Sequence, residues 1–200
     1  MKLKSIAFAA AAVSLVAAAP AHAGWKLVEG GQSHEVAKSD LTITPSVDWN
    51  RNTSRPIKRS EIWTLEGTTL NEVYFVGGLD EGKTLFKEFD KKGNPLPKMA
   101  SGMLLTDIPE FYESSTRTAL GTSLFEIESV EPTTFAGQPG VKFTFHYGIQ
   151  NDALIRKGMA MGTMVDGKLF LASYIAPSVY YFDRDLAKAE ALMKSARMGG

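Results

Sequence analysis

The chain of 200 residues contains no cysteine. This absence excludes disulfide bridges, thiolate nucleophiles and zinc or iron–sulfur sites held by cysteine. A charge excess is also lacking, because 22 Lys and Arg residues balance 22 Asp and Glu residues. Since a basic excess is typical of nucleic-acid-binding proteins, no nucleic-acid partner is expected. With 44% hydrophobic residues, the chain is too apolar to be disordered and should fold.

The amino-terminal residues 1–23 have the organisation of a secretory signal peptide. Lysines near the start precede an apolar stretch at residues 6–16, and Ala21 and Ala23 give the small-x-small pattern of a cleavage site. The apolar stretch is too short for a permanent span, which needs about 20 residues. We therefore predict cleavage after Ala23, a periplasmic or secreted product with no membrane span after processing, and a single domain over residues 24–200.

Strand and turn signals dominate the rest of the chain. Runs of β-branched and aromatic residues are bounded by glycine, proline and asparagine, which is typical of antiparallel strands. The predicted strands are residues 41–44, 61–66, 70–76, 124–130, 141–149, 158–165 and 168–175. Residues 48–60 are polar and are expected to form a loop.

The clearest hairpin is centred on Asp166-Gly167, a two-residue turn that places residues whose numbers sum to about 333 opposite each other. Both faces of this hairpin are apolar, so we expect cover on both sides. One face carries the large side chains Met159, Met161, Phe170 and Tyr174. The other face carries the small residues Gly158, Ala160 and Gly162, which suit a closely docked helix.

Two helices are predicted. Asp183 can cap a helix that runs from Arg184 to Met198, with apolar residues at spacings of three and four. This helix is expected on the small-residue face of the hairpin. A second helix should begin at Ile108, after Asp107, and end near Thr118. Antiparallel strands with separate helices indicate an α+β fold, an antiparallel sheet flanked by helices.

The segment Gly77–Thr84 matches the phosphate-binding loop pattern G-x-x-x-x-G-K-[ST]. Such a loop surrounds phosphate with backbone N–H groups in a positive field. Asp80 and Glu81 would place two negative charges among the phosphates, and residues 85–90 allow barely two helical turns. We therefore expect a turn between strands, no nucleotide partner and no cofactor.

Positive charge gathers in one polar segment, at Arg51, Arg55, Lys58 and Arg59. These side chains are candidates for contact with an anionic glycan or a lipid head group of the envelope. The alternative is a solvated loop with no ligand.

Catalytic and metal signals are weaker. Glu126 and Glu128 share one face of a strand at a separation that a pair of glycosidase carboxylates tolerates, and a solvated strand face is the alternative. His34 and His146 are the histidines of the processed chain and lie far apart in sequence. Because a zinc site needs three or four converging ligands, no metal site is expected.

Several short motifs occur in the order found in the PsbP/Mog1-like group. Leu41-Thr42-Ile43-Thr44-Pro45 followed by Asp48-Trp49-Asn50 resembles the opening of those domains. Gly167-Lys168-Leu169-Phe170, then Ala176-Pro177, then Lys194-Ser195-Ala196-Arg197 resembles their end. The pattern is also similar to that of uncharacterised exported proteins of Gram-negative bacteria.

This resemblance implies a PsbP/Mog1-like sandwich, an antiparallel sheet between helices, with accessory or binding roles and generally no catalysis. The group has no universal active-site motif, so the resemblance assigns no functional residue. The chain departs from the group by its polar insert at Asn50–Ser60.

The sequence therefore leaves three functions open. The first is a non-catalytic periplasmic accessory or binding protein of the cell envelope, whose partner is an unknown envelope protein. The second is a small-molecule or lipid carrier, with Met159, Met161, Phe170 and Tyr174 lining an apolar cavity. The third is an envelope hydrolase that uses Glu126 and Glu128 or a serine site.

Overall fold

A computed structural model of the chain describes residues 24–150 and 152–199. The predicted cleavage residues Ala21 and Ala23 lie outside these described residues. The largest element is an eight-stranded sheet in which all neighbouring strands are antiparallel. In spatial order its strands are β1 (Trp25–Val28), β4 (Trp49–Asn52), β5 (Ser60–Thr64), β6 (Glu72–Leu79), β10 (Lys168–Pro177), β9 (Ile155–Val165), β8 (Gln138–Gly148) and β7 (Phe125–Phe135).

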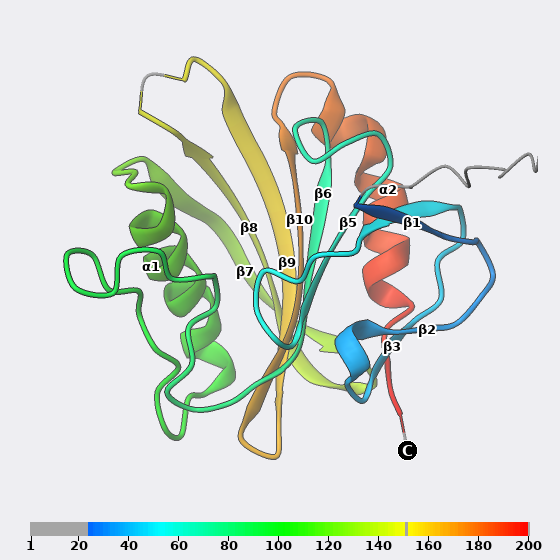
Figure 1. The fold of residues 1–200 in the computed structure, drawn as a ribbon, viewed down its shortest axis with the longest axis horizontal. Coiled ribbons are helices and arrows are strands. Elements are labelled where there is room, and N and C mark those ends of the chain that lie inside the picture. Colours follow the sequence, from blue (N-terminus) through cyan, green and yellow to red (C-terminus); the bar gives the residue numbers. More distant parts are fainter. Residues whose placement is uncertain (1–23, 151, 200) are drawn as a thin grey trace, which may run out of the picture.

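Helices cover both faces of this sheet, as Figure 1 shows. Helix α1 (Ile108–Leu120) follows the short 3-10 helix η2 (Leu105–Asp107) and packs on one face. Helix α2 (Tyr181–Lys194) packs on the other face. The 3-10 helix η1 (Val36–Lys38) and a small three-stranded sheet lie on the α2 side. The strands of the small sheet are, in spatial order, β11 (Arg197–Met198), β3 (Leu41–Ile43) and β2 (His34–Glu35). The predicted α+β class, an antiparallel sheet flanked by helices, is confirmed.

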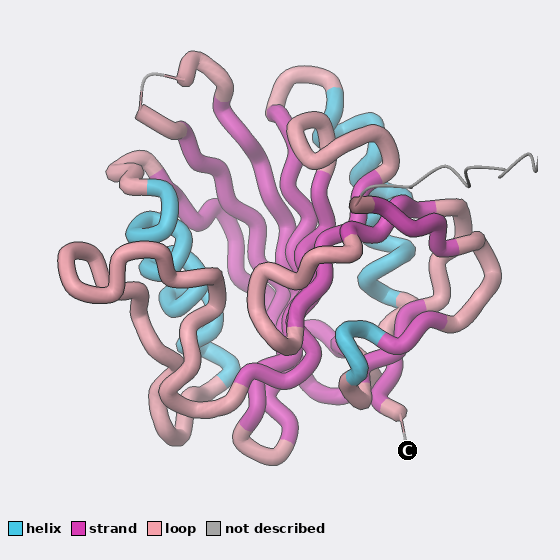
Figure 2. The backbone as a smooth tube through the Cα atoms, in the orientation of Figure 1, coloured by secondary structure: helices cyan, strands magenta, loops and turns pink. Residues whose placement is uncertain are grey.

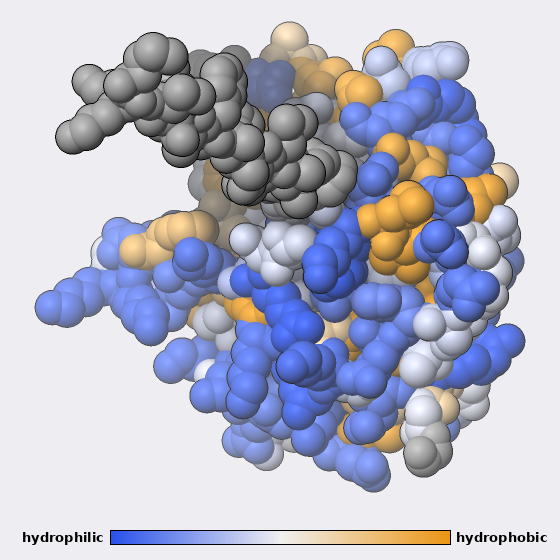
Figure 3. Space-filling view, turned by 45° about the vertical axis from the view of Figure 1, so that its right-hand side comes forward, coloured by the Kyte–Doolittle hydropathy of each residue, from blue (hydrophilic) through white to orange (hydrophobic). Residues whose placement is uncertain are grey.

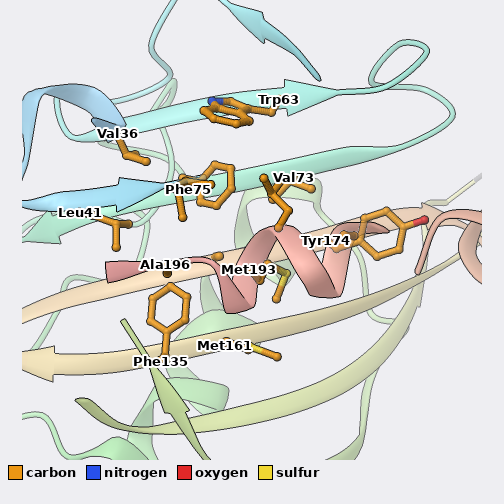
Figure 4. Close-up of a cluster of buried hydrophobic side chains, with 14 of the residues drawn as sticks. Val36, Leu41, Trp63, Val73, Phe75, Phe135, Met161, Tyr174, Met193 and Ala196 are labelled. Atoms are coloured by element: carbon orange, nitrogen blue, oxygen red, sulfur yellow. The ribbon is translucent and has the colours of Figure 1, made fainter. Parts of the chain in front are cut away.

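The predicted register of the β9–β10 hairpin is also confirmed. Met164 pairs with Leu169 and Met159 pairs with Tyr174, so the numbers of paired residues sum to 333. Because side chains alternate along a strand, Met161 and Tyr174 point to the same face, toward α2. Figure 4 shows Met161 below α2 and Tyr174 beside one end of the helix, and Met193 of α2 belongs to the same cluster.

The predicted position of the carboxy-terminal helix is wrong. The small-residue face of the hairpin is covered by α1, and a Cβ atom added to Gly162 would lie 3.2 Å from Cγ2 of Ile108. Helix α2 lies on the opposite face, where Phe182, Leu192 and Met193 join the apolar cluster and the Tyr174 hydroxyl lies 3.1 and 3.2 Å from the carbonyl oxygens of Tyr181 and Phe182. The start of α2 is therefore held on the side to which Tyr174 points.

Two further boundaries differ from the predictions. Residues 49–52, expected in a loop, form β4, which is inserted between β1 and β5 because the Trp49 side chain is buried there. Helix α2 begins at Tyr181 and ends at Lys194, because residues 197–198 pair with β3 as β11. Neither of the two α-helices nor any other helix within the described ranges is long and apolar enough to cross a membrane.

The surface on the side of α2 and β1 is mainly hydrophilic. Figure 3 shows hydrophilic residues over most of the described surface that faces the viewer, with hydrophobic residues in separate patches. Most of the buried apolar side chains are gathered in two clusters, one on each face of the main sheet.

Gly158 provides a test of the packing beneath α1. A Cβ atom at this position would overlap the ring of Phe145 on the neighbouring strand β8. We expect Gly158→Ala to lower the free energy of unfolding by about 1–3 kcal/mol, because overpacking forces the ring away from its place. When Phe145 is also replaced by Leu, Gly158→Ala should lower the free energy of unfolding by less. Urea titrations that give the same loss with and without Phe145→Leu would contradict this account.

Candidate functional site

A surface hollow of about 190 Å³ lies between the end of β6 and the segment that precedes β5. It brings together two segments that the sequence singled out separately, the basic stretch and the glycine-rich motif. Its lining residues are Ile57, Lys58, Arg59, Gly78, Leu79, Asp80, Lys83 and Thr84. We call this feature the basic hollow.

The glycines of the motif shape one wall of the basic hollow. Gly78 has a φ of +94° and lies at a register shift between β6 and β10, which makes it the extra residue of a β-bulge. Gly77 is required for another reason, because a Cβ atom there would overlap the side chain of Ser39, which follows η1. The motif therefore permits a bulge and a close contact between segments.

The arrangement lacks the cradle of a phosphate-binding loop. The N–H groups of Gly77, Gly82 and Lys83 donate to the carbonyl oxygens of Arg59, Met99 and Asp80 at 2.8, 2.9 and 3.2 Å. Thr84 forms an isolated bridge with Lys98 and begins no helix. Three of the amides that would surround a phosphate are thus used within the protein, and the absence of a nucleotide partner stays a prediction.

The charge of the basic hollow is positive. Lys58, Arg59 and Lys83 contribute three cations. The acidic lining residue Asp80 lies 3.5 Å from the ammonium group of Lys168, which offsets its charge. Arg59 is held in place because Nη1 donates to the carbonyl oxygen of Lys38 at 3.3 Å. An anion entering the hollow would therefore meet excess positive charge.

A second hollow of about 370 Å³ adjoins the first and shares Lys83 and Thr84 with it. Lys91 and Lys98 add two more ammonium groups to this extension. Its acidic residue is Glu88, whose Oε1 accepts the N–H of Leu96 at 3.1 Å. The positive surface thus continues from the basic hollow along the segment that follows β6.

The four basic residues singled out in the sequence fall into two pairs. Lys58 and Arg59 line the basic hollow, whereas Arg51 and Arg55 point toward Glu61 on β5. Arg51 Nη1 lies 3.4 Å and Arg55 Nη2 lies 3.8 Å from Glu61 Oε1. The structure therefore places Arg51 and Arg55 in an internal ion-pair network and not at the hollow.

Glu61 is the centre of that network, and its side chain is 1% exposed. Its Oε2 lies 3.1 Å from His34 Nε2 and accepts the indole N–H of Trp63 at 3.0 Å. Its Oε1 accepts the N–H of Ala37 at 2.9 Å. Burial raises the pKa of Glu61, but the hydrogen bonds from His34, Trp63 and Ala37 outweigh burial and hold the pKa below its ordinary value.

Glu72 on β6 is a partly buried carboxyl in the opposite situation. It faces the α1 side of the sheet, on the same face as Tyr74. Burial raises the pKa of Glu72 to about 7. Neither carboxyl could be singled out from the sequence, because the burial of both and the bonds of Glu61 to His34 and Ala37 come from segments distant along the chain.

The four residues proposed to line an apolar cavity are buried in the cluster beneath α2. Met159, Met161, Phe170 and Tyr174 are between 0% and 4% exposed. They pack with Phe182, Leu192 and Met193 of the helix, and none lines either of the two hollows described above. The observed arrangement is a packed core, and opening to a ligand stays an untested prediction.

Glu126 and Glu128 lie on the edge strand β7, where both face His146. His146 Nδ1 is 2.9 Å from Glu128 Oε1, and its Nε2 is 3.6 Å from Glu126 Oε2. The carboxylates are 68% and 40% exposed, respectively, and line neither hollow described above. Within residues 24–150 and 152–199 no group of three or more His, Asp or Glu side chains is arranged to hold a metal ion.

The charge of Glu61 is expected to stabilise the fold. Because its folded pKa is lowered from 4.5, the contribution is fully present above pH 4.5 and is lost as the pH falls through the folded pKa. Glu61→Gln should lower the free energy of unfolding by about 3 kcal/mol at neutral pH, since it leaves the arginines without a counter-charge. Urea titrations at several pH values should show a flatter acid profile for the variant; parallel profiles would contradict the prediction.

Glu72 should have the opposite effect on stability. Its folded pKa of about 7 lies above the ordinary value of 4.5, so the folded state holds the proton more tightly and stability falls as the pH rises from 4.5 to 7. Glu72→Gln should therefore stabilise the protein above pH 7, by on the order of 1–3 kcal/mol, and have little effect below pH 4.5. Thermal unfolding at pH 4 and pH 8 measures this effect. An equal effect of Glu72→Gln on stability at the two pH values would refute the assignment.

No protein-family model matches the chain, and no curated protein matches its sequence. Among solved structures it is similar to cyanobacterial PsbP (CyanoP) from Synechocystis sp. PCC 6803, with 13% identity, a TM-score of 0.48 and coverage of 88% of this chain and 93% of that chain. A protein from Bacteroides thetaiotaomicron matches over 85% of this chain with 9% identity and a TM-score of 0.48, and the chain spans only 49% of its length. LpqN, involved in cell envelope biogenesis of Mycobacterium tuberculosis, matches 88% of this chain and 91% of its own, with 8% identity and a TM-score of 0.35. One of these similar structures, CyanoP, is a PsbP protein, and PsbP proteins belong to the group that the sequence motifs resemble.

Proposed function

We propose that this protein is a non-catalytic accessory or binding protein of the periplasm, and that the basic hollow holds an anionic group of its ligand or partner. The observation that carries the proposal is the convergence of Lys58, Arg59 and Lys83 on one hollow whose acidic lining residue, Asp80, is paired with Lys168. A phosphate or carboxylate group would gain charge-assisted hydrogen bonds from these side chains.

The construction of the site supports binding more than catalysis. Arg59 is positioned by the carbonyl of Lys38, and Gly78 forms the wall without a side chain. Thr84 is the hydroxyl residue of the lining, and no histidine or unpaired carboxylate accompanies it to act as a base. The chemistry of the lining is that of an anion receptor, which recognises charge and holds it.

Calorimetry with inorganic phosphate and with glycerol phosphate tests the proposal. We expect binding that weakens as salt is added, because the contacts are ionic and exposed. Arg59→Gln and Lys83→Gln should each weaken binding about tenfold or more, the usual effect of removing a charged hydrogen-bond donor. Lys194→Gln, which removes an exposed lysine paired with Glu190 on α2, is the matched control and should bind as the unmodified protein does.

Asp80 allows a sharper test, because the expected change is a gain. Asp80→Asn removes the negative charge from the lining and should strengthen anion binding severalfold, whereas Lys168→Gln leaves Asp80 unpaired and should weaken binding. A gain of affinity is not produced by misfolding. If the unmodified protein binds neither anion, or if Asp80→Asn binds no better, the proposed role of the hollow is wrong.

A further inference from the structure

The connection between β6 and α1, residues 80–107, is the longest segment outside the named strands and α-helices of the described chain. Figure 2 shows it almost entirely as loop, on the α1 side of the sheet. Its base is fixed by two backbone bonds, Gly82 N–H to Met99 O and Met99 N–H to Lys83 O, both 2.9 Å. Leu85 and Leu96 are buried beneath it, so the residues between them form a protruding tip on an anchored base.

The tip is held in a defined shape by its own polar groups. Asp90 Oδ1 accepts the N–H groups of Lys92 and Gly93 at 3.3 and 2.8 Å. Glu88 accepts the N–H of Leu96, and Asn94 Nδ2 donates to the carbonyl oxygen of Thr118 on α1 at 3.1 Å. Both acidic side chains of the tip are thus occupied by backbone amides.

The lysines of this segment are left without carboxylate partners. Residues 83–98 contain five lysines and two acidic residues, Glu88 and Asp90. In the described part of the chain, the lysines that form ion pairs are Lys142, Lys168, Lys188 and Lys194. The five lysines of the segment, Lys83, Lys87, Lys91, Lys92 and Lys98, are all exposed and belong to none of these pairs.

Phe89 lies between Lys87 and Lys91 in sequence. Its side chain is 87% exposed, the largest exposed fraction among the large hydrophobic side chains of the described residues. Lys87 Nζ lies 5.1 Å from the centre of the Phe89 ring, and Lys91 and Lys92 follow on the other side in sequence. The fold leaves this ring in water although Leu85 and Leu96 beside it are buried. An exposed aromatic ring with one lysine over it and two more close by in sequence is suited to binding where apolar chains meet anionic head groups.

We propose that this tip, residues 87–93, docks on an anionic phospholipid surface, with Phe89 entering the boundary between head groups and acyl chains. Lys87, Lys91 and Lys92 then contact lipid phosphates, while their methylene stems lie along the interface. A lipid surface fits the tip because it offers both environments that the side chains require. The acyl chains can receive the single exposed ring, and the anionic head groups above them can contact the lysines before and after it in sequence. The contact is peripheral, since one ring and three lysines give a reversible attachment. It goes beyond the proposed function and uses other residues.

Co-sedimentation of the processed protein with vesicles tests this inference. We expect binding to vesicles of phosphatidylglycerol and phosphatidylethanolamine, little binding to phosphatidylcholine vesicles, and release by salt. Phe89→Ser should lower the partition coefficient about tenfold or more, the effect of losing a buried aromatic ring. The double variant Lys91→Gln, Lys92→Gln should lower it comparably and reduce its salt dependence.

The protein provides a matched control in Tyr180, before α2. Its ring is 64% exposed and has the Arg184 guanidinium at 5.4 Å, so it reproduces an exposed aromatic with a cation at a different site. Tyr180→Ser should partition as the unmodified protein does. Because Phe89 contributes little to the core, Phe89→Ser should keep the thermal stability of the unmodified protein.

Three results of the vesicle experiment would overturn the inference: no binding to phosphatidylglycerol vesicles, equal binding to phosphatidylcholine vesicles, or binding that Phe89→Ser leaves unchanged. An acidic protein that binds the tip and is displaced by no vesicle would also overturn it. Arg59→Gln separates the two proposals, because it should lose affinity for inorganic phosphate and keep vesicle binding. Failure of one measurement therefore leaves the other proposal standing.

Discussion

The buried carboxylate of Glu61 is the interaction on which the arrangement of the amino-terminal half depends. It joins β5 to Ala37 of η1, to Arg51 of β4 and to His34 of β2. Ala37 and the following Lys38 have φ angles of 53° and 57°, which side-chain-bearing residues rarely adopt, and the bond to Glu61 helps to hold this turn. The carbonyl of Lys38 in turn receives the guanidinium of Arg59. A carboxylate inside the protein thus fixes a cation at the surface, which connects the core to the basic hollow.

The segment Gly77–Thr84 had two interpretations in the sequence, a phosphate-binding loop and a turn between strands. Gly77 and Gly82 are spaced as in a phosphate-binding loop, but Gly77 serves a close contact with Ser39, and its neighbour Gly78 forms a bulge against β10. Lys83, which follows the bulge along the chain, lines the same hollow as Lys58 and Arg59. The motif therefore lies at a positive site although the backbone cradle is absent, because glycines at a strand end permit several geometries and their spacing alone does not select one.

The sequence determined local structure better than it determined which surfaces meet. The β9–β10 register could be predicted, because the Asp166-Gly167 turn fixes it within the segment itself. The face covered by α2 could not be predicted, because both faces of the hairpin are apolar and the choice depends on tertiary packing of the two helices. Glu61 gave no signal because its partner His34 lies 27 residues away. The basic stretch was recognised, but its division between the hollow and Glu61 required the strand β4, which the polar composition of residues 48–60 concealed.

The charge balance of the whole chain conceals strong local differences. Equal numbers of acidic and basic residues predict no field, yet the surface beside β6 is positive because of how the acids are used. Glu61 is buried among cations, Asp80 is paired with Lys168, and Glu88 accepts a backbone N–H. Each of these carboxylates is drawn toward a protein partner, while Lys83 and the lysines of the neighbouring tip remain directed to solvent. The placement of these carboxylates therefore gives a chain of neutral composition a local surface with excess positive charge, and this placement depends on tertiary contacts that a count of residues does not contain.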